Sequence, residues 1–227
     1  MHPDSLIIRR ETPADYAAAE HLTREAFWNV YRPGCNEHYI LHVLRHDPAC
    51  VPELDLVLEQ GGRLIGQILY LRARIRADDG RDIPVLTFGP LSIHPDCQGR
   101  GYGRYLLEQS MARARALGAG ALCIEGDAGF YGRSGFVPAG ARGIRCHGAP
   151  AGQDNPHFLL RELRAGFLRG VTGVYHTPGA ILSTKRRRRS LTAAFRPNPN
   201  GNCPGSCFET EYGPPPPIPC NGAQMPI

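Results

Sequence analysis

The chain has 227 residues, of which 42% are hydrophobic, a size that suits one ordinary domain with an extension or two small domains. Its formal net charge of +5 is matched by the basic run 185–189 alone, so the rest is nearly neutral and gives no strong signal for nucleic-acid binding. No run of about 18 apolar residues predicts a membrane span, and residues 1–4 lack the start of a secretory signal. We therefore expect a cytoplasmic protein, without a membrane partner, whose scattered cysteines are reduced.

The N-terminal part of the chain predicts one strand and two helices. Residues 6–10 predict a strand, and Thr12 followed by Pro13 is a typical helix start. We expect that helix to reach Trp28. A second helix is expected over residues 36–46, because four apolar side chains share one of its faces: Tyr39, Ile40, Val43 and Leu44.

Two hairpins should follow. Residues 54–58 and 64–75 predict strands joined by a glycine turn, and residues 83–93 predict a third strand. In the second strand, arginines alternate with apolar residues, which predicts an arginine face exposed to solvent. The third strand contains Gly89 and Pro90. Because proline cannot donate to a strand ladder, this pair predicts a bulge or a broken pairing that leaves backbone groups free for a ligand.

The segment after this strand is the most informative one in the chain. It reads Gln98-Gly99-Arg100-Gly101-Tyr102-Gly103-Arg104 and leads directly into an amphipathic helix that ends at Gly118. Alternate glycines let the backbone approach a bulky ligand, and a helix N-terminus offers unpaired N–H donors with a partial positive charge. Together these features predict an anion site, most often one for phosphate. A P-loop would need Gly-Lys-Ser/Thr at the helix start, and a dinucleotide fingerprint would need glycine at position 104, so the segment fits neither.

The next segment places titratable side chains after a short strand. Residues 121–124 predict a buried strand that ends at Glu125. Tyr131 follows within an aromatic, glycine-rich stretch, residues 129–136. Two further strands are expected near residues 143–146 and 157–163.

The composition changes at about His176, after which proline and polar residues dominate. Such a segment cannot bury enough apolar surface to offset its ordering entropy. We therefore expect a domain over residues 1–175 and a Pro-rich, basic, disordered tail over residues 176–227, so that a chain ending at about Gly173 should keep the fold. No metal site is predicted in the tail, because its cysteines have irregular spacing and no nearby histidine: Cys203, Cys207 and Cys220.

Two of these motifs resemble those of one enzyme superfamily. The pattern Gln-x-x-Gly-x-Gly, here Gln98, Gly101 and Gly103, resembles the pyrophosphate loop of the GNAT superfamily of N-acetyltransferases. Residues 129–136, in which Tyr131 precedes a Gly-Phe pair, resemble the short helix and turn of those enzymes. The resemblance covers Leu6 to Gly173. Three shorter stretches are similar to a bacterial branch of predicted acetyltransferases without an assigned substrate: residues 27–31, 86–91 and 126–127.

The resemblance implies an α/β fold, classed as α+β in some schemes. Its central sheet should be mixed and mostly antiparallel, with about seven strands flanked by about four helices. The fourth and fifth strands should splay, with the pantetheine arm of the cofactor in the gap. Arg161 departs from the family pattern, since it stands in the last strand where an apolar residue is usual, and this puts the packing of that strand in doubt.

The resemblance also implies an acyltransferase that uses acetyl-CoA and moves the acetyl group directly to a primary amine, on a small molecule or a peptide, in a ternary complex. Tyr131 would be the general acid that protonates the leaving thiolate. Glu125 would be the base, with Glu37 and His38 as alternatives that could line the acceptor site. The implied cofactor-binding residues are Leu91, Ser92, Ile93, Gln98, Gly99, Arg100, Gly101, Tyr102, Gly103 and Arg104.

Two other functions stay open from the sequence. The chain could be a non-catalytic acyl-CoA sensor that keeps the loop without turnover. It could also associate with nucleic acid through the basic run 185–189, although one such run is a common feature of tails and makes nucleic acid the less favoured partner. The sequence also leaves a homodimer open.

Overall fold

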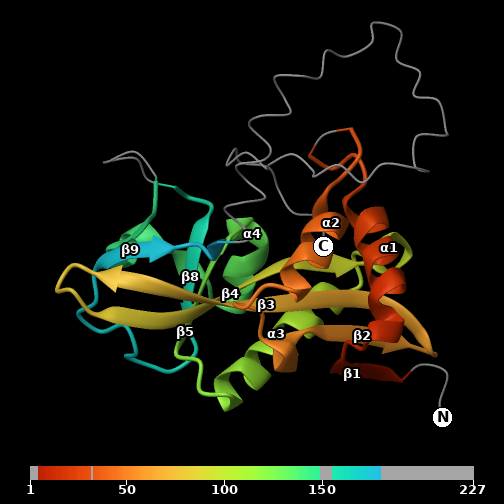
Figure 1. Ribbon diagram of the computed structural model, residues 1–227, viewed down its shortest axis with the longest axis horizontal. Helices are drawn as coiled ribbons and strands as arrows, with labels where there is room; N and C mark the ends of the chain where they lie inside the picture. The colour runs from red at the N-terminus through yellow and green to blue at the C-terminus, as the bar shows by residue number, and fades with distance from the viewer. Residues whose placement is uncertain (1–4, 32, 149–154, 180–227) are drawn as a thin grey trace, which may run out of the picture. The chain divides into compact units, whose positions relative to one another are not determined.

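The structure is a computed structural model that describes residues 5–31, 33–148 and 155–179. Within these residues one mixed sheet has the strand order β1-β2-β3-β4-β5-β8-β6, and β9 pairs with both β3 and β7 (Figure 1). The pairings β4–β5 and β7–β9 are parallel, and the others are antiparallel. The strands are β1 (Leu6–Arg10), β2 (Leu56–Gln60), β3 (Arg63–Ala77), β4 (Asp82–Ile93), β5 (Ala121–Glu125), β6 (Val137–Pro138), β7 (Ile144–Cys146), β8 (Phe158–Glu162) and β9 (Gly173–His176). The α-helices are α1 (Tyr16–Phe27), α2 (Glu37–Arg45), α3 (Tyr102–Ala116) and α4 (Ala128–Tyr131).

The predicted fold class is confirmed, and the strands expected from the sequence are all present near their predicted places. The described residues contain two further strands, β6 and β9. Each is too short to show an apolar alternation: β6 has two residues and β9 has four. The sheet therefore has nine strands where about seven were expected, and the two additional ones are these short strands.

Helices cover both faces of the sheet. On one face, the hydroxyl of Ser92 in β4 donates to that of Thr23 in α1 at 3.0 Å. On the other, the hydroxyls of Tyr70 in β3 and Ser110 in α3 lie 2.8 Å apart. Ser92 pairs with Gln67, and alternate residues of a strand point to opposite faces, so Gln67 and Tyr70 face opposite sides. We call these sides the α1 face and the α3 face.

A bulge interrupts β4 where the sequence predicts one. Leu91 pairs with Ile68, and Phe88 pairs with Tyr70, so the Gly89-Pro90 pair opposes the single residue Leu69. Gly89 has a φ of +146°, a conformation that residues with a side chain rarely adopt. The extra residue bends the strand and changes the direction of its later part.

After Leu86, β4 and β5 separate. A single residue pair, Leu86 with Leu122, joins the two strands. On the α3 face the ring of Phe88 lies 5.8 Å from that of Tyr131 and 6.1 Å from that of Phe136, measured between centroids. The last residues of β4 therefore have no strand partner on the β5 side, which confirms the predicted splay.

Arg161 does not disturb the last long strand of the sheet. It lies in β8, half-buried, next to the two-residue strand β6. Its guanidinium donates to the backbone carbonyl of Ser134 in the turn before β6. The charged group thus has a polar partner at the edge of the core, which accounts for an arginine where the family pattern has an apolar residue.

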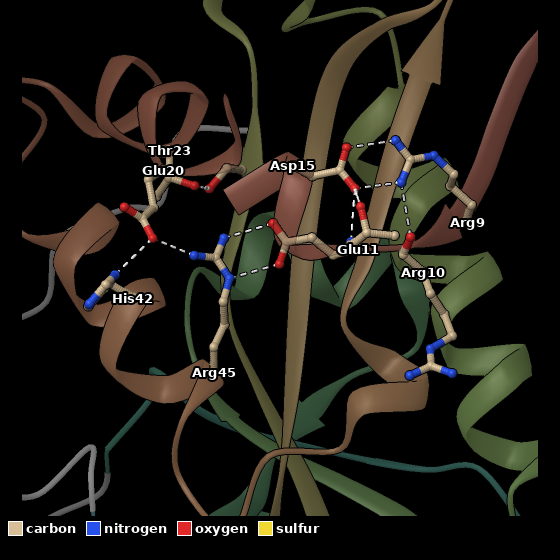
Figure 2. A network of polar contacts seen from close by, with 10 residues as sticks. Arg9, Arg10, Glu11, Asp15, Glu20, Thr23, His42 and Arg45 are labelled. Atoms are coloured by element: carbon tan, nitrogen blue, oxygen red, sulfur yellow. Dashed lines mark hydrogen bonds and ion pairs between the residues drawn. The ribbon is translucent and has the colours of Figure 1, made fainter. Parts of the chain in front are cut away.

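A buried network of charged groups connects the first two helices to the sheet (Figure 2). The guanidinium of Arg45 in α2 donates to both carboxylate oxygens of Glu11, at 2.8 and 2.7 Å, and to Glu20 in α1 at 2.5 Å. The side chains of Arg45 and Glu11 are 2% and 0% exposed. The backbone N–H of Glu11 also donates to the carbonyl of Asp55, at 2.8 Å. A buried pair with this bidentate geometry needs both partners, since either charge alone would be strongly destabilising.

The Asp55 carboxyl should make the stability of the fold depend on pH. Burial, and then the negative charge of Glu11, raise the pKa of Asp55 to about 8. The folded chain therefore holds a proton that the unfolded chain has released, so stability should fall by up to about 1.4 kcal/mol per pH unit between about pH 4 and 8. Asp55→Asn should flatten this slope in urea unfolding measured across that range. Asp82→Asn, which removes an exposed carboxylate, controls for the change in net charge, and a slope that Asp55→Asn leaves intact would contradict the assignment.

The shortened chain expected to keep the fold, which ends at about Gly173, would lose most of β9, because that strand begins there; the expected domain boundary at residue 175 also falls inside β9. Residues of β9 pair with β3 and β7, and Tyr175 is buried with its ring 5.2 Å from that of Phe158. We expect a chain that ends at Thr172 to lose at least about 3 kcal/mol, the usual cost of losing one buried aromatic side chain. A chain that ends at Pro178 should keep the thermal midpoint of the full chain. Equal midpoints for the two shortened chains would show that β9 contributes nothing. The predicted tail beyond Gly179, with its basic run and its cysteines, lies outside the described residues.

Candidate active site

The glycine-rich segment forms a backbone loop between β4 and α3. The ring nitrogen Nδ1 of His94 accepts the N–H of Asp96 at 3.3 Å, which caps the first turn after the strand. The side-chain amide of Gln98 donates to the carbonyl of Ile93 at 3.0 Å. Gly99 and Gly101 have φ values of +74° and +83°, and a Cβ at either position would meet no atom within 4 Å. Their backbone therefore faces open space that only a glycine leaves clear at low strain.

The loop presents unpaired donors at the start of α3. The first backbone bond of this helix runs from the N–H of Tyr105 to the carbonyl of Gly101, at 3.0 Å. The N–H groups of residues 102–104 come before it, and Gly101 has no side chain to cap them. These donors and the helix dipole favour an anion at this position.

A pocket of about 320 Å³ lies in front of these donors, between the loop and α4. Most of the predicted cofactor-binding residues line it: Ile93, Gln98, Gly99, Gly101, Tyr102, Gly103 and Arg104. Three others do not line it: Leu91, Ser92 and Arg100. It also includes three residues that the sequence did not single out: Cys97, Phe130 and Arg133. Arg104 and Arg133 thus line the same pocket as the unpaired N–H groups, and the Arg104 guanidinium also donates to Glu108 one turn along α3, at 2.7 Å.

The open edge of β4 leads away from this pocket. The N–H of His94 donates to the carbonyl of Ile65 at 2.9 Å, so His94 belongs to a hydrogen-bonded pair with β3. Because such pairs alternate along an antiparallel ladder, the backbone of Ser92 also faces β3, whereas Leu91 and Ile93 direct their N–H and C=O groups toward the gap. The side chain of Ser92 lies on the α1 face, where its hydroxyl donates to Thr23.

Tyr131 lies at the end of α4 in an aromatic cluster on the α3 face. The residue is 1% exposed, and its ring centroid lies 4.8 Å from that of Phe130 and 5.6 Å from that of Phe136. Burial, together with Tyr31, Tyr70 and Asp127, raises the pKa of Tyr131 well above its ordinary value. Its phenol is therefore protonated at neutral pH and can act as a donor. Tyr131 itself does not line the pocket, which its neighbour Phe130 reaches.

Glu125 lies on the opposite side of β5 from this cluster. Alternate residues of a strand share a face, so Glu125 lies on the same side of β5 as Ala121 and Cys123. Those two residues belong to a second core cluster between β5 and the β7–β9 pair. The thiol of Cys146 donates to its carboxylate at 3.7 Å. The structure thus places Glu125 and Tyr131 near the same end of β5 but on different faces of the sheet.

The alternative bases lie at the start of α2. The Glu37 carboxylate accepts the N–H of Asn36 at 2.9 Å. His38 Nδ1 lies 3.3 Å from the sulfur of Cys35. Burial lowers the pKa of His38 and raises the pKa of Cys35, so this pair is a neutral imidazole beside a neutral thiol.

Comparison with known proteins agrees with this geometry. Residues 53–138 match the sequence profile of the acetyltransferase (GNAT) domain. This stretch of the chain therefore resembles a GNAT acetyltransferase domain. It is 32% identical over 102 residues to the uncharacterized N-acetyltransferase YjhQ of Escherichia coli K12, a match that covers 44% of this chain and 55% of that protein. The chain thus spans about half the length of this curated relative.

Two solved structures resemble this chain over most of its length. The GNAT family N-acetyltransferase YhbS of Escherichia coli, in complex with CoA, is 25% identical with a TM-score of 0.65, over 76% of this chain and 89% of that one. A GNAT family acetyltransferase of Brucella melitensis, in complex with acetyl-CoA, is 26% identical with a TM-score of 0.60, over 78% of this chain and 98% of that one.

Two kinds of feature are absent from the residues that the structure describes. No group of three or more His, Cys, Asp or Glu side chains there could hold a metal ion. No helix in the described residues is long and apolar enough to cross a membrane.

Proposed function

We propose that this domain is an acetyl-CoA-dependent N-acetyltransferase that moves the acetyl group directly to a primary amine in a ternary complex. One observation carries the proposal. The pocket with unpaired N–H donors at the start of α3 adjoins the unpaired edge of β4, so an anion site is continuous with a strand-like binding edge. The two structural relatives in complex with CoA and acetyl-CoA support it.

The residues present fit the two polar parts of this cosubstrate. The N–H groups of residues 102–104, with the guanidinium groups of Arg104 and Arg133, would hold the diphosphate. The backbone groups of Leu91 and Ile93 would bind the pantetheine amides as an added strand would. When bound, acetyl-CoA supplies a thioester acyl group.

The reaction needs two proton transfers: one from the attacking amine nitrogen and one to the leaving sulfur. An alkyl amine with a pKa of about 10.4 is mostly charged at neutral pH, and neutralising it costs about 4 kcal/mol. As the C–N bond forms and the C–S bond breaks, Glu125 would accept a proton from the amine nitrogen, directly or through water. Tyr131 would donate one to the leaving sulfur and regain it from solvent. Because the gap passes through the sheet, Tyr131 can act from the α3 face and Glu125 from the α1 face.

The experiment that tests this function uses the full chain. CoA and acetyl-CoA should bind by calorimetry, and CoA should be released when acetyl-CoA is mixed with a panel of small amines and lysine peptides. Binding without release on any amine would identify a sensor that has lost turnover. No binding of either nucleotide would refute the proposed function.

A further inference from the structure

The residue after β5 is a glycine that lies against the ring of the proposed general acid. Gly126 follows the strand on the side of Leu122 and Ile124, which belong to the core of the α3 face. A Cβ at position 126 would overlap Cε2 of Tyr131 and lie 2.8 Å from its Cδ2. Carbon atoms in contact lie about 3.5–4.0 Å apart. The ring of Tyr131 therefore occupies the space that a side chain at position 126 would need.

Neither the ring nor the glycine has room to move apart. Tyr131 is 1% exposed, and its ring centroid lies 4.8 Å from that of Phe130 and 5.6 Å from that of Phe136. The N–H of Gly126 donates to the carbonyl of His157 at 2.8 Å, which holds the glycine backbone in place. In a core packed at this density, a displaced ring must displace its neighbours as well.

The contact involves the half of the ring that carries the hydroxyl. Cε2 of Tyr131 is bonded to Cζ, and Cζ itself would lie 3.5 Å from a Cβ at position 126. A side chain there would therefore shift the phenol oxygen, from which the proton would leave. A proton donor must lie about 2.6–3.2 Å from its acceptor, so even a small shift of that oxygen weakens the transfer.

The short turn between Gly126 and Tyr131 is fixed by the residue next to the glycine. The carboxylate of Asp127 accepts the N–H groups of Gly129 and Phe130 at 3.1 and 3.0 Å. Its backbone carbonyl accepts the N–H of Tyr131 at 2.9 Å. The end of β5 and the start of α4 thus form one hydrogen-bonded unit that carries both the glycine and the ring.

We propose that Gly126 is a positioning residue for proton transfer: the absence of a side chain there sets where the Tyr131 hydroxyl lies at the end of the gap between β4 and β5. The inference rests on the proposed function and adds a residue to the same site. Gly126 does not have a positive φ, so the backbone conformation does not require glycine at this position. The three atoms nearest to a Cβ at position 126 all belong to Tyr131, so the space for this ring accounts for the glycine.

Gly126→Ala tests the residue by adding one methyl group. We expect kcat to fall by about 10- to 100-fold, the range for a small misplacement of a reacting group, while the KM for acetyl-CoA stays constant. In Tyr131→Phe, which has no hydroxyl to position, the same change should alter kcat by less than about 2-fold. A residue with a structural role alone would lower kcat by the same factor in both backgrounds. Gly132→Ala is the matched control, because a Cβ there meets no atom within 4 Å and the φ of −58° suits alanine, so it should change none of these values.

The position of the ring can also be measured without turnover. In NMR spectra of the free chain with isotope-labelled tyrosine, the Tyr131 signal is the one missing from Tyr131→Phe. This signal should shift in Gly126→Ala and stay in place in Gly132→Ala. Should Gly126→Ala fail to fold, Asp127→Ala, which removes both side-chain bonds at the start of α4, should lower kcat. Asp127→Asn, which keeps an acceptor oxygen, should retain most of it.

Several outcomes would overturn the inference: an unchanged kcat or an unchanged Tyr131 signal in Gly126→Ala, equal losses in the two backgrounds, or equal kcat values for Asp127→Ala and Asp127→Asn. Acetyl transfer by the unmodified chain would still support the proposed function in each of those cases. A chain that binds no CoA and transfers no acetyl group would refute the proposed function and this inference with it.

Discussion

Replacing Tyr131 with phenylalanine should lower kcat by about 10² to 10⁴-fold, the usual contribution of a general acid. The ring and its contacts with Phe88, Phe130 and Phe136 remain, so the change removes only the hydroxyl. Affinity for acetyl-CoA should change little, because the proton is needed mainly as negative charge develops on the sulfur. The loss should be smallest at low pH, where solvent protonates the thiolate more readily. Steady-state kinetics across the pH range, with calorimetry for affinity, would measure both effects.

Tyr70→Phe provides the matched control. Tyr70 is also a fully buried tyrosine on the α3 face, next to Phe88, but its hydroxyl is engaged with Ser110 at 2.8 Å. Its loss should cost about 1 kcal/mol of stability and leave kcat unchanged. If Tyr131→Phe instead behaves like this control, then Tyr131 is a core residue and water protonates the thiolate.

The second large effect is expected at Gly101, where the loop enters α3. Gly101→Asp places a carboxylate in the open space that faces the helix donors, where a Cβ meets no atom within 4 Å. Two like charges about 4 Å apart near a protein surface repel by about 4 kcal/mol, so CoA affinity should fall by about 10³-fold.

Gly101→Asn separates charge from shape. Asparagine and aspartate have nearly the same size, and both tolerate a left-handed backbone such as the φ of +83° at this position. Asn should therefore reduce CoA affinity much less than Asp, and both variants should keep a cooperative thermal transition. Equal affinities for Asp and Asn, with CoA measured by calorimetry, would mean that no phosphate approaches the loop at Gly101.

The features predicted correctly from the sequence are local ones. The bulge follows from Gly89 and Pro90, which are adjacent and which a strand ladder cannot accommodate. The open loop and pocket at the start of α3 follow from a glycine-rich turn directly before a helix, since helix ends leave donors unpaired whatever the rest of the fold does. That an anion binds there stays a prediction. In both cases a few consecutive residues determine the conformation.

The features that the sequence missed depend on residues far apart in the chain. The pairing of Arg74 with His176 joins segments about a hundred residues apart, and four-residue β9 carries no pattern that would identify its partner. Arg133 was not singled out although it lies in the stretch 129–136, because its place at the pocket depends on the turn after α4. The placement of Glu125 opposite Tyr131 also needed the strand register, which fixes the face of each residue.

The single backbone pair between β4 and β5 makes the two halves of the sheet depend on side chains for their cohesion. An ordinary ladder would connect them through many main-chain bonds that tolerate substitution of any one residue. Here the connection on the α3 face includes the rings of Phe88, Tyr131 and Phe136. The same rings surround the proposed proton donor at the end of the gap. The proposed catalytic geometry and part of the cohesion between β4 and β5 therefore depend on the same aromatic residues, so selection for either property would constrain the other.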